Sequence, residues 1–213
     1  MPIDLDRCII FVHIPKTGGT SIESVLGMTR RINLFSTKPI PGLPVADRTP
    51  QHFTWRELLS CLPPGFPDAA FKFAFVRNPW DRFVSEFLWR RRLRDSRLRY
   101  GSYLTDLDSF VRLLDLPPAR RKSAAGLDGH LETQTSFLVD ETGALSMDFI
   151  GRFECFDVDV REVLRRIGVP ATNVPHLARG ARDGTYRSWF SAYSRGAVES
   201  FYRDDVRMFG YRF

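Results

Sequence analysis

The sequence predicts an α/β fold in which a central parallel sheet is flanked by helices on both faces. Three short apolar runs, over residues 8–12, 71–76 and 148–153, are rich in β-branched or aromatic residues and have the length of buried strands. Segments with helical apolar spacing separate these runs, and strands that alternate with helices form parallel sheets. We therefore expect a three-layer arrangement in one domain that spans residues 1–213.

A glycine-containing loop follows the first predicted strand and reads His13-Ile-Pro-Lys-Thr-Gly-Gly-Thr-Ser21. Gly18 and Gly19 allow the backbone to turn so that successive N–H groups point at one anion. The positive end of the following helix favours the same negative charge, and Lys16 adds a cation. The loop therefore predicts a phosphate site and a P-loop-like fold.

The order of residues in this loop differs from that of the NTPase loop G-x-x-x-x-G-K-[ST], because Lys16 precedes Gly18. A structural alternative is that Thr20-Ser21-Ile22-Glu23 forms a helix capping box. A capping box does not require Lys16, Thr17 and two glycines, so phosphate binding is the favoured interpretation.

Between the first and second predicted strands, the chain contains an irregular stretch and one short helix. The prolines and the glycine within residues 33–50 exclude a helix or a central strand there. A short helix is expected over residues 54–61, and Pro63-Pro64-Gly65 ends it.

The longest predicted helix begins at Asn78 and Pro79, which are a favourable N-cap and a favourable first helical residue. Its apolar side chains recur with helical spacing, so one face packs on the sheet. Its C-terminal half carries a run of arginines, which are Arg90, Arg91, Arg92, Arg94, Arg97 and Arg99. Such a run is most often a solvated face. The alternatives are a site for an acidic acceptor, for a nucleic acid or for an acidic patch on a second subunit.

Further helices are expected over residues 106–114, 158–167 and 194–209, the second of them capped by Asp157. Residues 119–129 are polar, basic and glycine-containing, which is typical of a surface loop.

The composition indicates a globular protein that binds anions. The formal net charge is +6 and the pI is near 9.5. No apolar run approaches the roughly 20 residues that span a bilayer, and Asp4 and Asp6 before the first apolar run are unlike a signal peptide. Three widely spaced cysteines without a C-x-x-C pair argue against a disulfide framework or a zinc site, so we expect a reducing cytoplasm.

A second strand-to-helix junction lies at residues 75–87. Arg77 stands at the carboxyl end of its strand, the edge where open α/β sheets bind ligands. Ser85 lies on the following helix, where side chains lean toward the N-terminus, so a guanidinium and a hydroxyl can converge on one anion. The alternative is that Arg77 pairs with Asp81 and that Ser85 is an ordinary helix residue.

Taken together, the two junctions resemble the sulfotransferase superfamily, and especially its carbohydrate and heparan-type, family 2-like branch. Residues 11–21 are similar to the family's 5′-phosphosulfate loop, and residues 76–85 to its 3′-phosphate motif. Supporting matches are His130-Leu-Glu-Thr-Gln134, Asp148-Phe-Ile-Gly-Arg-Phe-Glu154, Val174-Pro-His-Leu177 and Phe209-Gly-Tyr211.

The resemblance implies 3′-phosphoadenylyl sulfate (PAPS) as donor, adenosine 3′,5′-bisphosphate as product and no metal. Lys16 would contact the bridging oxygen of the phosphosulfate, and Arg77 and Ser85 would hold the 3′-phosphate. The 5′-phosphate would be bound through backbone N–H and hydroxyl groups of Thr17, Gly18, Gly19, Thr20 and Ser21.

The acceptor hydroxyl also needs a base. His52 sits where heparan-type relatives place a catalytic histidine, and His130 is the other candidate, while His13 is expected to be structural. Glu132 and Glu154 are weaker carboxylate alternatives. Arg179-Gly180 and Arg182 could close over the 3′-phosphate, although they depart from the Arg-Lys-Gly motif of cytosolic sulfotransferases.

The sequence thus predicts transfer of a sulfuryl group from PAPS to a hydroxyl of a carbohydrate, lipid or small-metabolite acceptor. One alternative is a small-molecule kinase or NTPase, which would need a magnesium-binding carboxylate such as Asp81 or Asp148. A second alternative is a nucleic-acid-binding protein that uses the arginine-rich helix, although nucleic acid is not the favoured partner. A third is a non-catalytic nucleotide-binding relative.

Overall fold

The structure is a computed structural model that describes residues 3–27, 50–93, 101–118, 120–121, 129–170 and 185–213. The chain divides into two compact units. Unit 1 comprises Met1–Val76 and Ser136–Gly180, and unit 2 comprises Arg77–Thr135 and Ala181–Phe213.

A four-stranded sheet lies in unit 1. Its strands, in spatial order, are β1 (Ile3–Asp4), β2 (Ile9–Val12), β3 (Phe71–Val76) and β4 (Phe149–Arg152). β2, β3 and β4 are parallel, whereas β1 pairs antiparallel with β2. The three strands expected from the sequence are confirmed, and so is an α/β fold with a mostly parallel sheet flanked by helices. The two-residue β1 was not predicted.

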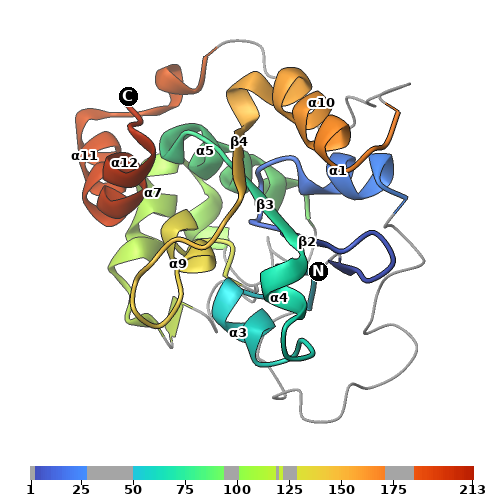
Figure 1. The fold of residues 1–213 in the computed structure, drawn as a ribbon. Helices are drawn as coiled ribbons and strands as arrows, with labels where there is room; N and C mark the ends of the chain where they lie inside the picture. The colour runs from blue at the N-terminus through green and yellow to red at the C-terminus, as the bar shows by residue number, and fades with distance from the viewer. Residues whose placement is uncertain (1–2, 28–49, 94–100, 119, 122–128, 171–184) are drawn as a thin grey trace. The chain divides into compact units, whose positions relative to one another are not determined.

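Two helices of unit 1, α1 (Gly19–Val25) and α10 (Phe156–Arg166), pack on one face of this sheet (Figure 1). Alternate strand residues point to that face, as the two-residue period of a strand requires. The shared core consists of Ile9, Phe11, Ile22, Leu26, Phe73, Phe75, Phe156, Val160, Val163 and Leu164.

The remaining elements of unit 1 are short. They are α3 (Trp55–Leu59), α4 (Phe66–Ala69), the 3-10 turns η1 (Pro50–His52) and η4 (Phe153–Cys155), and the end of α9 (Gln134–Leu138). The helix expected over residues 54–61 is α3, and Thr54 caps it through a capping box with Glu57.

The described residues of unit 2 are largely helical, and the longest element is α5 (Pro79–Arg92). Asn78 caps α5 and Pro79 opens it, as predicted. The other elements are α7 (Leu107–Val111), α11 (Ala192–Phe201), α12 (Arg203–Phe209), η2 (Gly101–Leu104), η3 (Arg112–Asp115) and η5 (Tyr186–Trp189).

Helix termini differ from the sequence predictions at three places. The first helix begins at Gly19 with Gly18 as its N-cap, so the capping box at Thr20 is wrong. Helix α10 begins at Phe156, which places Asp157 inside its first turn rather than at the cap. The C-terminal helix is divided at Tyr202, whose φ of −94° and ψ of 28° interrupt the helical backbone.

The arginine run is also not the uniform solvated face that was predicted. α5 ends at Arg92, and Arg90 is only 1% exposed, with its guanidinium paired with Glu86. Arg94, Arg97 and Arg99 lie outside the described residues, as do residues 28–49, 122–128 and 171–184.

Candidate active site

The loop after β2 has the backbone of a tight turn. Gly18 has a φ of 91° and Lys16 a φ of 70°, both in the left-handed region. Such a conformation is strained for a lysine by about 1–3 kcal/mol and is typical of functional loops. The Thr17 hydroxyl donates to the carbonyl of Ile14 at 2.9 Å and so closes the turn from within.

The two glycines are required for packing as well as for the turn. A Cβ on Gly18 would lie 2.6 Å from the Phe156 ring, and a Cβ on Gly19 would collide with the imidazole of His13. The loop therefore lies directly against two side chains of unit 1.

His13, which the sequence analysis expected to be structural, is buried, and its imidazole pairs with a carboxylate. Its Nδ1 lies 2.6 Å from Oε1 of Glu23, and its ring stacks on Phe11 with centroids 5.5 Å apart. Gln51 donates to both carboxylate oxygens of Glu23 at 3.0 Å. Burial acts to raise the pKa of Glu23, but the hydrogen bond and charge of His13 and the Gln51 amide outweigh burial, so this pKa lies below its usual value.

Ser21 gives the loop a feature that fits a bound phosphate. Its residue is fully buried, and its Oγ has no hydrogen-bond partner among the atoms of the described residues. A buried hydroxyl left without a partner costs about 1–3 kcal/mol, which an incoming acceptor oxygen would relieve. The N–H groups of Ser21 and Ile22 already donate to the carbonyl of Gly18, so the N–H groups of Gly19 and Thr20 are the donors that the first turn of α1 could add to this hydroxyl.

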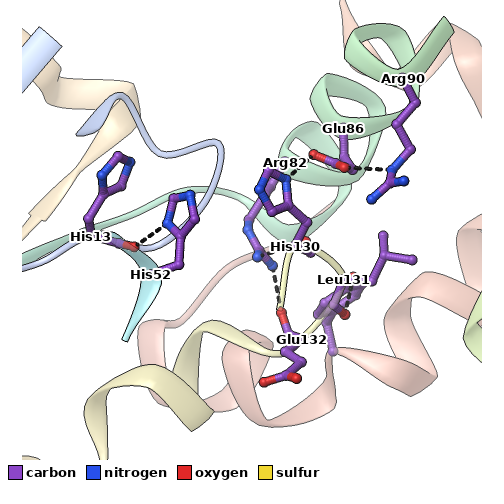
Figure 2. A network of polar contacts seen from close by, with 9 residues as sticks. His13, His52, Arg82, Glu86, Arg90, His130, Leu131 and Glu132 are labelled. Carbon is purple, nitrogen blue, oxygen red and sulfur yellow. Dashed lines mark hydrogen bonds and ion pairs between the residues drawn. The ribbon is translucent and has the colours of Figure 1, made fainter. Parts of the chain in front are cut away.

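His52, the first candidate base, belongs to unit 1. Its Nδ1 lies 3.0 Å from the backbone carbonyl of His13, and the two imidazoles meet edge to face with centroids 4.7 Å apart (Figure 2). Because a carbonyl can only accept, Nδ1 of His52 carries the proton. In the neutral ring, Nε2 then carries the lone pair that a general base needs.

Arg77 directly follows the last residue of β3, as predicted. Its Nε donates to Oδ2 of Asp81 at 2.7 Å, so the ion pair that was weighed as the structural alternative is present. Gln134 fixes the backbone of Arg77 from both sides, accepting from its N–H and donating to its carbonyl, each at 2.8 Å. Ser85 is half-buried on α5, one turn beyond Asp81.

His130, the second candidate base, belongs to unit 2 and is part of a charged network (Figure 2). Its Nδ1 lies 2.9 Å from Oε2 of Glu86, whose other oxygen accepts from Nε of Arg90 at 2.7 Å. Glu132 is half-buried, and its backbone carbonyl accepts from Arg82, whereas Glu154 is exposed.

The carboxylates that a kinase would need are engaged elsewhere. Asp148 lies just before β4, at the amino ends of the parallel strands and so away from their carboxyl ends. Its carboxylate accepts from the backbone N–H of Lys72 and pairs with the ammonium group of the same lysine. Asp81 pairs with Arg77. Within the described part of the chain, no three His, Cys, Asp or Glu side chains cluster closely enough to hold a metal ion.

With this geometry established, the comparison with known families is decisive, since the sequence model of the sulfotransferase family matches residues 3–212. The chain belongs to the sulfotransferase family. No curated protein and no solved structure matches it. Membership supports sulfotransfer activity, and both segments predicted to bind phosphate lie inside the matched range.

Several residues of this sulfotransferase-family site were not predicted from the sequence. Glu86 and Arg90 have the four-residue spacing of a helical ion pair, which was a usable signal. The partnership of His13 with Glu23 and that of Gln134 with Arg77 join residues 10 and 57 positions apart, which no local pattern reveals. The family motifs around Arg179 and Val174 lie outside the described residues.

A search of the described helices for a membrane-spanning segment found none of sufficient length and apolarity.

Proposed function

We propose that this protein transfers a sulfuryl group from PAPS to a hydroxyl of a carbohydrate, lipid or small metabolite. The observation that carries the proposal is the buried Ser21 hydroxyl in the first turn of α1, directly after the loop that contains Lys16. This hydroxyl finds no hydrogen-bond partner in the part of the chain that the structure describes. Because the chain belongs to the sulfotransferase family, we expect the phosphate that binds at this position to be part of a sulfate donor.

The donor would be held by residues that follow two neighbouring parallel strands. Lys16 and the backbone and hydroxyl groups of residues 17–21 would bind the 5′-phosphosulfate, and Arg77 and Ser85 would bind the 3′-phosphate. In support, β2 and β3 are parallel partners, so the segments that follow them begin at the same edge of the sheet. Arg77 would give up part of its ion pair with Asp81 in order to bind the 3′-phosphate.

The chemistry would be an in-line transfer that depends on positioning and on charge neutralisation, as phosphoryl transfer does. Lys16 and the amino end of α1 would balance the charge that develops on the 5′-phosphate. His52 or His130 would accept the proton of the acceptor hydroxyl, and the structure gives each of them a fixed Nδ1–H. No metal has a role in this scheme.

We also propose a three-layer, P-loop-like domain that includes both units, because the family match extends across them. A cytoplasmic location stays a prediction from the cysteine content. The kinase alternative receives no support from Asp148 or Asp81, whose carboxylates are bound to cationic side chains.

Calorimetry with adenosine 3′,5′-bisphosphate and ADP tests the proposal. We expect the bisphosphate to bind at least about tenfold more tightly, because a charged hydrogen bond to the 3′-phosphate contributes roughly 1.5–3 kcal/mol. A preference for ADP, or no binding of either nucleotide, would exclude a PAPS site.

The variant Arg77→Ala should weaken bisphosphate binding by about 10- to 100-fold and leave 5′-AMP binding nearly unchanged. Arg203→Ala, at an exposed arginine of α12, is the matched control and should change neither affinity. Equal losses for both nucleotides in Arg77→Ala would remove the assigned role of Arg77.

A further inference from the structure

Residues 130–132 form a segment whose backbone is fixed at every carbonyl. Arg82 donates to the carbonyl of His130 at 3.0 Å and to that of Glu132 at 2.8 Å. The carbonyl between them, that of Leu131, accepts from the Tyr202 hydroxyl at 2.9 Å. Three successive carbonyls are therefore held by side chains rather than by a strand or helix partner.

The imidazole of His130 is held as firmly as its backbone. Its ring lies on the indole of Trp89 with centroids 5.3 Å apart and planes only 19° apart. Its Nδ1 lies 2.9 Å from Glu86, and Glu86 is held in turn by Arg90. Arg82, Glu86 and Arg90 on α5 follow one another at four-residue spacing, and Trp89 comes three residues after Glu86, so Glu86 has its network neighbours on the same side of the helix.

All three members of the network are buried, and His130 is the least deeply buried of them. The side chains of Arg90 and Glu86 are each 1% exposed, whereas that of His130 is 10% exposed. Burying two charges has a desolvation cost that an apolar pair of similar size would avoid. A segment that merely needed anchoring could be packed by apolar side chains, so the charge of Glu86 requires a further explanation.

Glu86 also selects the tautomer of His130. A carboxylate oxygen can only accept, so Nδ1 of His130 carries the proton and Nε2 of the neutral ring carries the lone pair. When the ring takes up a second proton, the negative charge of Glu86 stabilises the imidazolium that forms. The Nδ1 of His52 meets the carbonyl of His13, and a neutral carbonyl stabilises an imidazolium less than a carboxylate does.

We propose that Glu86 is a positioning residue that holds His130 as the general base for the acceptor hydroxyl. The inference rests on the proposed sulfotransferase function and deepens it. As the hydroxyl oxygen bonds to sulfur, its proton moves to Nε2 of His130. The sulfur–oxygen bond to the 5′-phosphate breaks, and adenosine 3′,5′-bisphosphate leaves with the bonding electrons.

The test compares Glu86→Gln with the unmodified protein, using PAPS as donor and water as acceptor, and measures the release of adenosine 3′,5′-bisphosphate. The glutamine keeps the size and an acceptor oxygen but removes the charge. We expect kcat to fall on the order of 10²-fold, while calorimetry shows bisphosphate affinity within about twofold. Glu162→Gln is the control, since Glu162 is likewise a helix glutamate paired with an arginine four residues later, Arg166, and also with Arg165; it should leave kcat unchanged.

A double-mutant cycle distinguishes positioning from a structural role. If Glu86 acts through His130, then His130→Gln alone should lower kcat at least as much, and adding Glu86→Gln should lower it no further. Additive losses, or unchanged turnover in Glu86→Gln, would overturn the inference.

Two further measurements keep the outcome interpretable. If Glu86→Gln does not fold because Arg90 loses its counter-charge, Glu86→Gln with Arg90→Met removes both charges and should show the same loss of kcat. Absence of bisphosphate binding in the unmodified protein would instead refute the proposed function, whereas intact binding with an active Glu86→Gln variant would refute only the role of Glu86.

Discussion

At the scale of single residues, the phosphate loop depends on how little space surrounds its glycines. The sequence suggested that Gly18 and Gly19 serve the turn and the anion. The φ of Gly18 confirms the turn, but Gly19 has an ordinary φ and is needed because His13 occupies the space of a side chain. His13 cannot move aside freely, since Glu23 and Phe11 hold it. The loop and the buried ion pair are thus one packed unit.

Gly19→Ala should therefore destabilise the protein by about 1–3 kcal/mol, the usual cost of overpacking a core. It should also weaken binding of adenosine 3′,5′-bisphosphate, because the displaced imidazole shifts the loop. Urea unfolding and calorimetry measure the two effects. Gly196→Ala on α11 is the control, because a Cβ there meets no atom within 4 Å. That substitution should stabilise the helix by about 0.5–1 kcal/mol, and a stable Gly19→Ala variant with unchanged affinity would contradict this account.

At the scale of elements, residues 130–134 run along α5 toward its amino end. His130 meets Glu86, the carbonyl of Glu132 meets Arg82, and Gln134 meets Arg77. Asp205 fixes the far end, since its carboxylate accepts from the backbone N–H groups of Gln134 and Thr135. Burial raises the pKa of Asp205, and these hydrogen bonds act against that shift. The contacts between residues 130–134 and α5 with the residue before its cap therefore fix both a candidate base, His130, and a proposed phosphate ligand, Arg77.

The variant Gln134→Ala tests whether Gln134 fixes Arg77. It removes the two hydrogen bonds that the Gln134 amide makes with the N–H and the carbonyl of Arg77, at about 1–3 kcal/mol for each bond. We expect unfolding at lower urea concentration and weaker bisphosphate binding, with 5′-AMP binding less affected. The comparison is Gln51→Ala, which removes the partly buried hydrogen bonds from the Gln51 amide to the carboxylate of Glu23. It should lower the free energy of unfolding by about 1 kcal/mol. An equal, small effect of both substitutions would show that Gln134 does not secure Arg77.

At the scale of the whole molecule, local patterns predicted the elements better than they predicted the partners. Residues 71–76 were identifiable because an aromatic and β-branched run is bounded by turn signals, and α5 because Asn78 and Pro79 mark its start. β1 was missed because two residues carry no periodicity. The break at Tyr202 was missed because the apolar spacing continues through it. Partners such as Glu86 and His130, 44 residues apart, are set by tertiary packing that no short window contains.

We proposed that residues 16–21 bind the 5′-phosphosulfate of the donor and that Arg77 and Ser85 bind its 3′-phosphate. A ligand that binds both should therefore protect both. At a bisphosphate concentration of 100 times Kd, linkage adds about 2.7 kcal/mol of stability, or roughly 5–10 °C in Tm for a chain of this size.

Hydrogen exchange followed by mass spectrometry locates that stabilisation. Adenosine 3′,5′-bisphosphate should slow amide exchange in peptides that cover residues 13–26 and in those that cover residues 77–92. ADP lacks the 3′-phosphate, so at equal saturation it should protect the first segment alone. If the bisphosphate protects only residues 13–26, the loop binds a nucleotide but Arg77 and Ser85 do not bind its 3′-phosphate. Protection confined to residues 77–92 would instead remove the loop from the site, because a donor held through Lys16 and Ser21 cannot leave their amides exchanging freely.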